Sequence, residues 1–255
     1  MPTWNADQYL RFLNQRTQPC WDLANRVALE APQRVIDLGC GPGNSTAVLA
    51  QRWPKADLTG LDSSAAMITA ARASAPDRHW IQADIDHWHP AECFDLVFSN
   101  AALQWLPNHA ELFPRLLTRV APGGALAVQM PVNDDAPAHR LLHDLARASR
   151  WSNRLSNLRQ WHVHEPAFYD DILSPVSSRV DLWITQYLHI LTGPEEIVEW
   201  YKGTGLRPYL DALTNPTDRE DFLAEYRAAI TAAYPSQRSG KVIFPFRRIF
   251  LVAWH

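Results

Sequence analysis

The sequence predicts an α/β protein built on a doubly wound sheet. Five short apolar runs alternate with segments of helical spacing, glycines cluster after the first run, and an aspartate stands at or near the end of each of the first three. Alternating β-α units form a parallel sheet with right-handed crossovers, and its ligand crevice lies at the carboxyl ends of the strands. We therefore expect a ligand at that edge of the sheet.

The parallel strands and the helices between them are predicted from apolar spacing and helix-stop residues. The five strands are expected at residues 34–38, 56–62, 79–84, 94–100 and 125–130. Helices are expected at residues 44–53, from a Ser63-Ser64 cap to about residue 75, at 109–120 and at 137–149. The first three helices are each followed by a stop, at Pro54, Pro76 and Pro122-Gly123-Gly124.

The two ends of the chain are expected to add further elements to this sheet. Residues 5–29 have helical spacing, and we expect Pro19 to divide them into two short helices. Residues 180–191 and 241–254 alternate like strands, which predicts two late antiparallel strands at one sheet edge. We expect one domain over 1–255, with N-terminal helices in 1–30 and a helical cap insertion at 192–240 over the active site.

The composition is that of a globular protein that binds a small molecule. The 255 residues carry a net charge of −3, without a basic stripe for nucleic acid and without an apolar run of about 18 residues for a membrane. The N-terminus lacks the apolar core of a secretory signal. The three cysteines, Cys20, Cys40 and Cys93, are far apart and form no zinc-like cluster with histidine, which favours a reducing cytoplasm and no metal. We expect a monomer.

The glycine cluster predicts a loop that lets the backbone approach a ligand. Residues 39–44 read Gly-Cys-Gly-Pro-Gly-Asn, a G-x-G-x-G pattern that is one residue short of the dinucleotide fingerprint, with Asn44 where that pattern has glycine or alanine. Asp37, Asp62 and Asp84 stand at the ends of three parallel strands. They therefore line one crevice with the loop.

These three carboxylates favour a cationic ligand over a pyrophosphate. Asp37 suits an ammonium, Asp62 suits both hydroxyls of a ribose, and Asp84 suits an exocyclic amine, while the N–H of Ile85 donates to the ring. Met67 and Ile85 are placed to sandwich an adenine. S-adenosylmethionine has these groups in this order. The alternative is that each aspartate only caps a turn and that Met67 and Ile85 are ordinary core residues.

Four motifs resemble those of the class I S-adenosylmethionine-dependent methyltransferases, whose sheet is Rossmann-like: VIDLGCGPGNST (35–46), GLDSS with Met67, QADI (82–85) and NAALQWLPNH (100–109). The resemblance implies a cofactor-binding set. Its members are Asp37, Gly39, Gly41, Asn44, Asp62, Ser63, Met67, Asp84, Ile85, Asn100 and Ala101.

Motifs along nearly the whole chain resemble one family in this class, the trans-aconitate 2-methyltransferases. They are WNADQYLRF, QRWPKA, NAALQWLPNHAELFP, LAVQMP, FYDDIL, TGLRPYL and FPFRRIFLVA. Two segments depart from the family. In NQRTQPC (14–20) Arg16 matches but Gln15 and Gln18 replace charged residues, and segment 150–165 matches none of its motifs. Both departures concern the acceptor rather than the fold.

The resemblance implies methyl transfer to a carboxylate oxygen of a small polycarboxylic acid, which gives a methyl ester and S-adenosylhomocysteine. A carboxylate is ionised at neutral pH, so this step needs no general base and no catalytic acid–base residue is expected. The protein holds oxygen, methyl carbon and sulfur in line and excludes water. Asn100 and Trp105, after the fourth strand, are expected to position both ligands.

Recognition of a polycarboxylate requires arginine and hydrogen-bond donors. The expected substrate-binding residues are Arg16, Trp105, Tyr169, Tyr201, Arg207 and Arg247. Arg207 is favoured because Gly203, Gly205 and Pro208 shape a turn around it. Period-two alternation places Arg247 and Arg248 on opposite faces of the last strand, and the sequence leaves open which of them faces the pocket.

Three other functions remain open. A methyltransferase for a hydroxyl, amine or carbon nucleophile would need a base, for which His109, His162, His164 or Tyr169 are candidates. A nucleotide-binding oxidoreductase is disfavoured by Asn44 and by the late edge strands. A module that binds the cofactor without turnover is disfavoured by the aromatic-rich insertion.

Overall fold

The computed structural model describes residues 12–156, 158 and 160–255, which form two compact units. The first, which we call the sheet unit, comprises Asn14–Pro131, Trp161–Thr185 and Arg248–His255. The second, the helical unit, comprises Val132–Gln160 and Gln186–Arg247, together with Phe12 and Leu13. The expected motif WNADQYLRF falls almost entirely on residues 1–11, as does the first half of the first expected N-terminal helix, and these residues lie outside the described ones.

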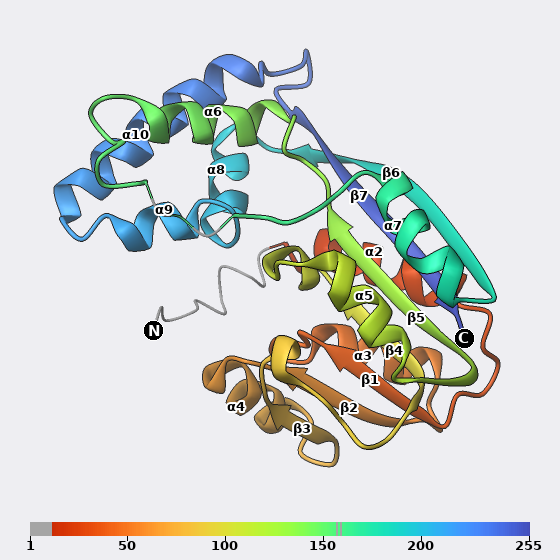
Figure 1. The fold of residues 1–255 in the computed structure, drawn as a ribbon. Coiled ribbons are helices and arrows are strands. Elements are labelled where there is room, and N and C mark those ends of the chain that lie inside the picture. Colours follow the sequence, from red (N-terminus) through yellow and green to blue (C-terminus); the bar gives the residue numbers. More distant parts are fainter. Residues whose placement is uncertain (1–11, 157, 159) are drawn as a thin grey trace. The chain divides into compact units, whose positions relative to one another are not determined.

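A seven-stranded sheet runs in the order β3-β2-β1-β4-β5-β7-β6 (Figure 1). The strands are β1 (Arg34–Leu38), β2 (Asp57–Asp62), β3 (His79–Gln82), β4 (Phe94–Asn100), β5 (Val120–Pro131), β6 (Arg179–Leu191) and β7 (Val242–Trp254). The first five pair in parallel, and β7 pairs antiparallel with β5. The predicted fold class is therefore confirmed, including the late edge strands.

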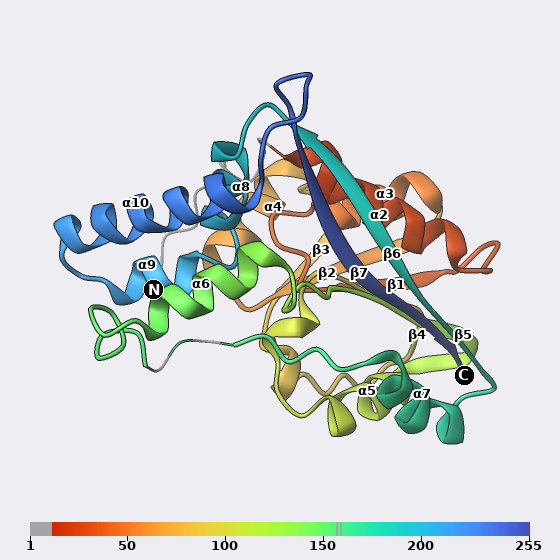
Figure 2. The same ribbon diagram turned by 90° about the horizontal axis from the view of Figure 1, so that it is seen from above.

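Helices cover both faces of the sheet in the sheet unit. They are α2 (Leu13–Arg26), α3 (Asn44–Arg52), α4 (Ala65–Ser74), α5 (His109–Leu117) and α7 (Pro166–Leu173), with short 3₁₀ turns η1 (Ile85–His87), η2 (Leu103–Trp105) and η3 (Ser174–Val176). Helices α2, α3 and α4 lie on one face, and α5 and α7 on the other (Figure 2). Covered on both faces, β1 buries Val35, Ile36 and Leu38 completely, as parallel strands do.

The helical unit has its own aromatic core. Its helices are α6 (Pro137–Arg147), α8 (Glu195–Lys202), α9 (Arg207–Ala212) and α10 (Pro216–Ala233). Trp151, Trp200, Phe222, Tyr226 and Phe244 are fully buried among them, and rings this large supply most of the apolar area that such a unit removes from water. The expected insertion 192–240 lies entirely in this unit, which also includes residues 132–160.

Two local predictions were wrong. Pro19 lies inside α2 and does not end it, because Arg16, Pro19, Cys20, Leu23 and Val27 form one buried stripe whose packing outweighs the lost backbone hydrogen bond.

The second concerns Pro122-Gly123-Gly124, which was expected to stop a helix and instead belongs to β5. A register shift against β4 accommodates these residues, and Gly123 has a φ of +79°. Helices α7 and α9 were not predicted. In the described part of the chain, no helix is long and apolar enough to cross a membrane.

Candidate active site

The glycine loop is the turn from β1 to α3, and it has the backbone that glycine permits. Gly39, Gly41 and Gly43 have φ values of +74°, +54° and +97°. A Cβ on Gly39 would lie 2.2 Å from Cβ of Ala102, so glycine is required there by packing. A Cβ on Gly41 would meet no atom within 4 Å. The space beside Gly41 is therefore open to a ligand.

Asp62, at the end of β2, holds this loop in place. Its Oδ2 accepts a hydrogen bond from the N–H of Gly41 at 3.0 Å, and its Oδ1 accepts one from the N–H of Ser64 at 2.8 Å. Ser64 in turn caps α4 by accepting from the N–H of Met67. Each carboxylate oxygen has a second acceptor site, so Asp62 can also accept from a ligand.

Asp37, on β1, is a buried carboxylate beneath the loop. Only 1% of it is exposed, and its Oδ2 accepts from the hydroxyls of Ser45 at 2.6 Å and Thr46 at 2.7 Å. Its Oδ1 is buried and has no partner. Burial raises the pKa of Asp37 to about 6, although the hydrogen bonds from Ser45 and Thr46 oppose this rise.

The residues expected around an adenine lie after β2 and β3. Met67 and Ile85 are 7% and 8% exposed, so each has most of its side chain packed. Asp84 is exposed, and its Oδ1 accepts from the N–H of Asp86 at 3.0 Å. Asp84 thus caps η1, which is the role that the turn-capping alternative predicts for it. Among the described residues, no backbone N–H donates to its Oδ2. Ser63 is exposed beside Asp62.

The loop that follows β4 has a strained backbone and polar atoms without partners. Ala101 has a φ of +55°, a left-handed conformation that costs a non-glycine residue about 1–2 kcal/mol. Its N–H donates to the carbonyl of Gln129 at 2.9 Å, and its carbonyl accepts from Nε2 of Gln104 at 2.8 Å. Oδ1 of Asn100 and Oε1 of Gln104 are buried and have no hydrogen-bond partner in the described part of the chain.

A buried histidine fixes the same loop. Nε2 of His109 lies 3.0 Å from the carbonyl of Leu103, so this nitrogen carries the proton, and Nδ1 accepts from the hydroxyl of Tyr169 at 2.9 Å. The hydroxyl of Tyr169 also accepts from the N–H of His164. Burial lowers the pKa of His109 to about 4, so the ring is neutral at physiological pH. Both ring nitrogens are engaged, which argues against His109 as a general base.

Residues 161–165, the end of the segment that matched no motif, and Tyr169 in the FYDDIL motif pack on this loop. The N–H of His162 donates to the carbonyl of Gln104 at 2.8 Å, and the ring of Trp161 meets Trp105 edge to face at 5.8 Å. Tyr169, expected to bind substrate, is fully buried with its hydroxyl engaged by His109. In this structure it supports the loop, a role that spacing along the sequence does not reveal.

The other expected substrate residues are divided between the two units. Arg16 lies in the sheet unit and is 8% exposed. In the helical unit, Tyr201 is buried and its hydroxyl has no partner, whereas Nε of Arg207 lies 3.5 Å from Oδ2 of Asp211. Arg247 is exposed, so it is the outward residue of the pair on β7, and its expected role in substrate binding stays a prediction.

Arg248 is the inward residue. It is 5% exposed and belongs to the sheet unit. Its Nη1 donates to Oε1 of Gln129 at 3.2 Å. Sequence reasoning left this choice open, because alternation places the two arginines on opposite faces without saying which face is covered.

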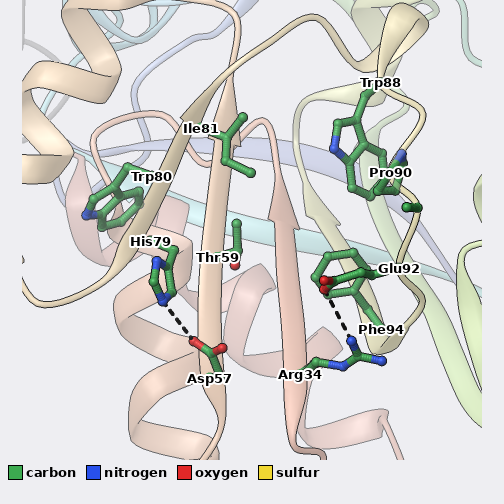
Figure 3. A pocket seen from close by; sticks show the side chains of 11 residues that line it. Arg34, Asp57, Thr59, His79, Trp80, Ile81, Trp88, Pro90, Glu92 and Phe94 are labelled. Carbon is green, nitrogen blue, oxygen red and sulfur yellow. Dashed lines mark hydrogen bonds and ion pairs between the residues drawn. The ribbon is translucent and has the colours of Figure 1, made fainter.

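A hollow of about 510 Å³ opens elsewhere on the sheet unit (Figure 3). Its lining includes Arg34, Asp57 and His79, at the amino ends of β1, β2 and β3, and its charged side chains form the pairs Arg34–Glu92 at 3.2 Å and His79–Asp57 at 3.7 Å. None of the expected cofactor residues lines it. It lies at the end of the strands opposite the glycine loop, so it is not the predicted site.

The raised pKa of Asp37 gives a pH-dependent stability. Because this pKa is about 6 in the folded protein and near 4 in an unfolded chain, the folded state binds the proton more tightly, and stability falls as pH rises between about 4 and 6. Relative to Asp37→Asn, which cannot titrate, the wild type should gain about 1 kcal/mol of unfolding free energy from pH 7.5 to pH 5, measured by urea unfolding. Asp77→Asn, at an exposed position, is the control. An identical pH profile for wild type and Asp37→Asn would contradict a buried, shifted carboxyl.

Comparison with known proteins identifies the family. Residues 35–124 match the model of a methyltransferase domain. A trans-aconitate 2-methyltransferase from Azoarcus sp. (strain BH72) is 48% identical over 99% of both chains, and one from Methylobacterium nodulans is 49% identical over 99% of this chain and 98% of that relative.

Solved structures show the same fold at low identity. The YcgJ protein of Bacillus subtilis has a TM-score of 0.60 at 13% identity and covers 92% of this chain and 97% of its own. Phosphoethanolamine N-methyltransferase 2 of Haemonchus contortus has a TM-score of 0.56 at 15% identity, over 93% of this chain and 52% of its own. The full-length identity to the Azoarcus and Methylobacterium enzymes decides membership: the chain belongs to the trans-aconitate 2-methyltransferase family.

Proposed function

We propose that this protein transfers the methyl group of S-adenosylmethionine to a carboxylate of trans-aconitate, which gives a monomethyl ester and S-adenosylhomocysteine. The observation that carries the proposal is identity of 48% and 49% over essentially the full length of relatives named for this activity. Similarity limited to the glycine loop and sheet would support the cofactor alone. Similarity that extends through the helical unit also supports the acceptor.

The carboxyl edge of the sheet fits the cofactor strand by strand. In the order β3-β2-β1-β4, Asp84 suits the adenine amine, Asp62 the ribose hydroxyls, Asp37 and the glycine loop the methionyl end, and Asn100 the methyl group. Two observations support this fit. The space beside Gly41 is open, and Asp37 Oδ1, Asn44 Nδ2 and Asn100 Oδ1 are buried polar atoms without partners.

The proposed reaction requires orientation rather than acid–base chemistry. When bound, the cofactor supplies an electrophilic methyl carbon on a sulfonium. The acceptor carboxylate is already ionised, so no residue has to remove a proton. The role of the chain is then to hold the loop from Ala101 to Trp105 rigid and to exclude water. The neutral His109 and the Tyr169 hydroxyl serve the first of these tasks.

Arg207 and Arg16 are proposed to bind carboxylates that do not react, because a guanidinium matches a carboxylate with two parallel hydrogen bonds. Trp105 and Tyr201 are proposed as walls. We further propose that the protein works as a monomer in the cytoplasm and binds no nucleic acid. Its described cysteines are all free, which accords with a reducing compartment.

The test is a methyl-transfer assay with S-adenosylmethionine and a panel of carboxylic acids, read by mass spectrometry of the products. We expect trans-aconitate to be the best acceptor, with a rate that is flat in pH above about 6, because its carboxylates are ionised there. A rate that rises through pH 6–7 with a hydroxyl or amine acceptor, and no methylated acid, would replace this function with the base-dependent alternative.

Asp62 tests the cofactor site. Asp62→Ala should weaken binding of S-adenosylhomocysteine by about 2–3 kcal/mol, because it removes charge-assisted hydrogen bonds to the ligand and the anchor of Gly41. Asp62→Asn should lose less. Titration calorimetry measures the effect, and Asp57→Ala, at the other end of β2, is the control. Unchanged affinity in Asp62→Ala would make Asp62 a turn residue only.

Arg207 tests the acceptor. Arg207→Ala should raise the KM for trans-aconitate by about tenfold or more and leave affinity for S-adenosylhomocysteine within about twofold, as expected for a lost charged hydrogen bond. Arg207→Lys should rescue poorly, because an ammonium cannot form the bidentate pair. Arg227→Ala, at an exposed position of α10, is the matched control. Wild-type kinetics in Arg207→Ala would leave Arg207 as a structural partner of Asp211.

A further inference from the structure

Gln129 is a buried amide on β5 whose donor group has no partner. The residue is fully buried, and its Nε2 makes no hydrogen bond to any residue that the structure describes. Its Oε1 accepts from Nη1 of Arg248 at 3.2 Å. A buried donor without a partner costs free energy, so we expect that the amide of Gln129 either binds a ligand or has another function.

The orientation of this amide does not depend on how its two ends are assigned. A guanidinium only donates hydrogen bonds, so the end of the amide that faces Arg248 must be the oxygen. The opposite end is then the NH₂ group. Arg248 is itself buried and on the neighbouring strand β7, where Phe250, two residues on, pairs with Gln129. Gln129 therefore presents a donor whose direction is fixed by a charged neighbour.

The place of Gln129 in the sheet points to the acceptor. Gln129 pairs with Asn100 of β4, and directly paired residues project from the same face of a sheet. In the proposed arrangement the cofactor extends over β3, β2, β1 and β4, and its methyl end lies at Asn100. The next strand is β5. A donor on β5 thus lies one strand beyond the proposed place of the methyl group, where it could contact an acceptor bound beside the cofactor.

We propose that Gln129 is a specificity residue that donates a hydrogen bond from Nε2 to the reacting carboxylate of the acceptor, and that Arg248 is the positioning residue that fixes its amide. This inference rests on the proposed function. The hydrogen bond engages one carboxylate oxygen and leaves the other free. The free oxygen uses a lone pair to form the oxygen–carbon bond, the carbon–sulfur pair remains on sulfur, and no proton moves.

A neutral amide suits this position better than a charged group. A guanidinium in direct contact would stabilise the carboxylate before reaction more than in the transition state, where its charge is being neutralised by the methyl group. An amide orients the carboxylate with a smaller penalty. Arg248 polarises the amide through Oε1 and so strengthens the donor without touching the acceptor.

The test compares Gln129→Met and Gln129→Glu, with Gln51→Glu at an exposed position of α3 as the control for the charge change. Gln129→Met keeps the length and loses the donor, so kcat/KM for trans-aconitate should fall about tenfold to hundredfold while the Kd of S-adenosylhomocysteine stays within about twofold. Gln129→Glu can still accept from Arg248 and should fold, but its charge repels the acceptor and should lower kcat/KM further. Gln51→Glu should resemble the wild type.

The role of Arg248 is tested by a double-mutant cycle. Arg248→Lys should lower kcat/KM in the wild-type background and have little further effect once Gln129→Met has removed the amide, because the two changes act on one hydrogen bond. Additive losses would show that Arg248 acts elsewhere and would overturn its positioning role.

Two results would overturn the role of Gln129. Equal losses of S-adenosylhomocysteine affinity and of kcat/KM in Gln129→Met would place the amide on the cofactor. Wild-type kinetics in both Gln129 variants would make the amide a structural residue. These outcomes are distinct from failure of the proposed function, which would appear as an absence of trans-aconitate methylation by the wild-type protein.

Discussion

The hydrogen bonds of one carboxylate, Asp62, shape the edge of the sheet on which the site is built. Because β1 and β2 are parallel neighbours, the turn that leaves β1 lies beside the end of β2. Asp62 accepts from the backbone of both following turns, at Gly41 and at Ser64. The N–H groups of Gly39 and Cys40 also donate to the carbonyl of Leu61, and Asp62 extends this anchoring to Gly41, which limits the conformational entropy of a loop of left-handed glycines. The same carboxylate keeps acceptor sites for a ligand, so loop order and ligand binding depend on one group.

Polarity changes sign across this edge. Asp37 and Asp62 stand on β1 and β2, Asp84 follows β3, and the buried cation Arg248 stands on β7 beyond β5. A cationic cofactor over the first strands and an anionic acceptor over the last ones match that gradient. Burial raises the pKa of Asp37, and a cation bound nearby would lower it again.

Residue spacing predicted the parts of this protein that depend on local pattern. The apolar runs of β1 and β4 have the predicted bounds, because a short apolar run with polar residues around it is typical of a buried parallel strand. Tertiary packing decided the rest. Pro19 is tolerated because its helix has a continuous buried stripe. Residues 161–169 support the loop after β4, although the residues in contact are some 60 positions apart in the sequence. Alternation on β7 showed that Arg247 and Arg248 differ, but only the burial of one face decides which points inward. Gln129, within LAVQMP, carried no signal that separates it from its apolar neighbours.

In the proposed arrangement, the charged group nearest the reacting carboxylate stands one residue back from it. The guanidinium of Arg248 acts on the acceptor through the amide of Gln129. His109 is held neutral by burial. In a water-poor site, a full charge in direct contact with the nucleophile would hold it in its ground state, because a carboxylate loses its negative charge as the ester forms. Neutral donors backed by charges keep the nucleophile oriented and reactive. That arrangement is what a reaction needs when both reactants arrive already ionised and the protein supplies geometry alone.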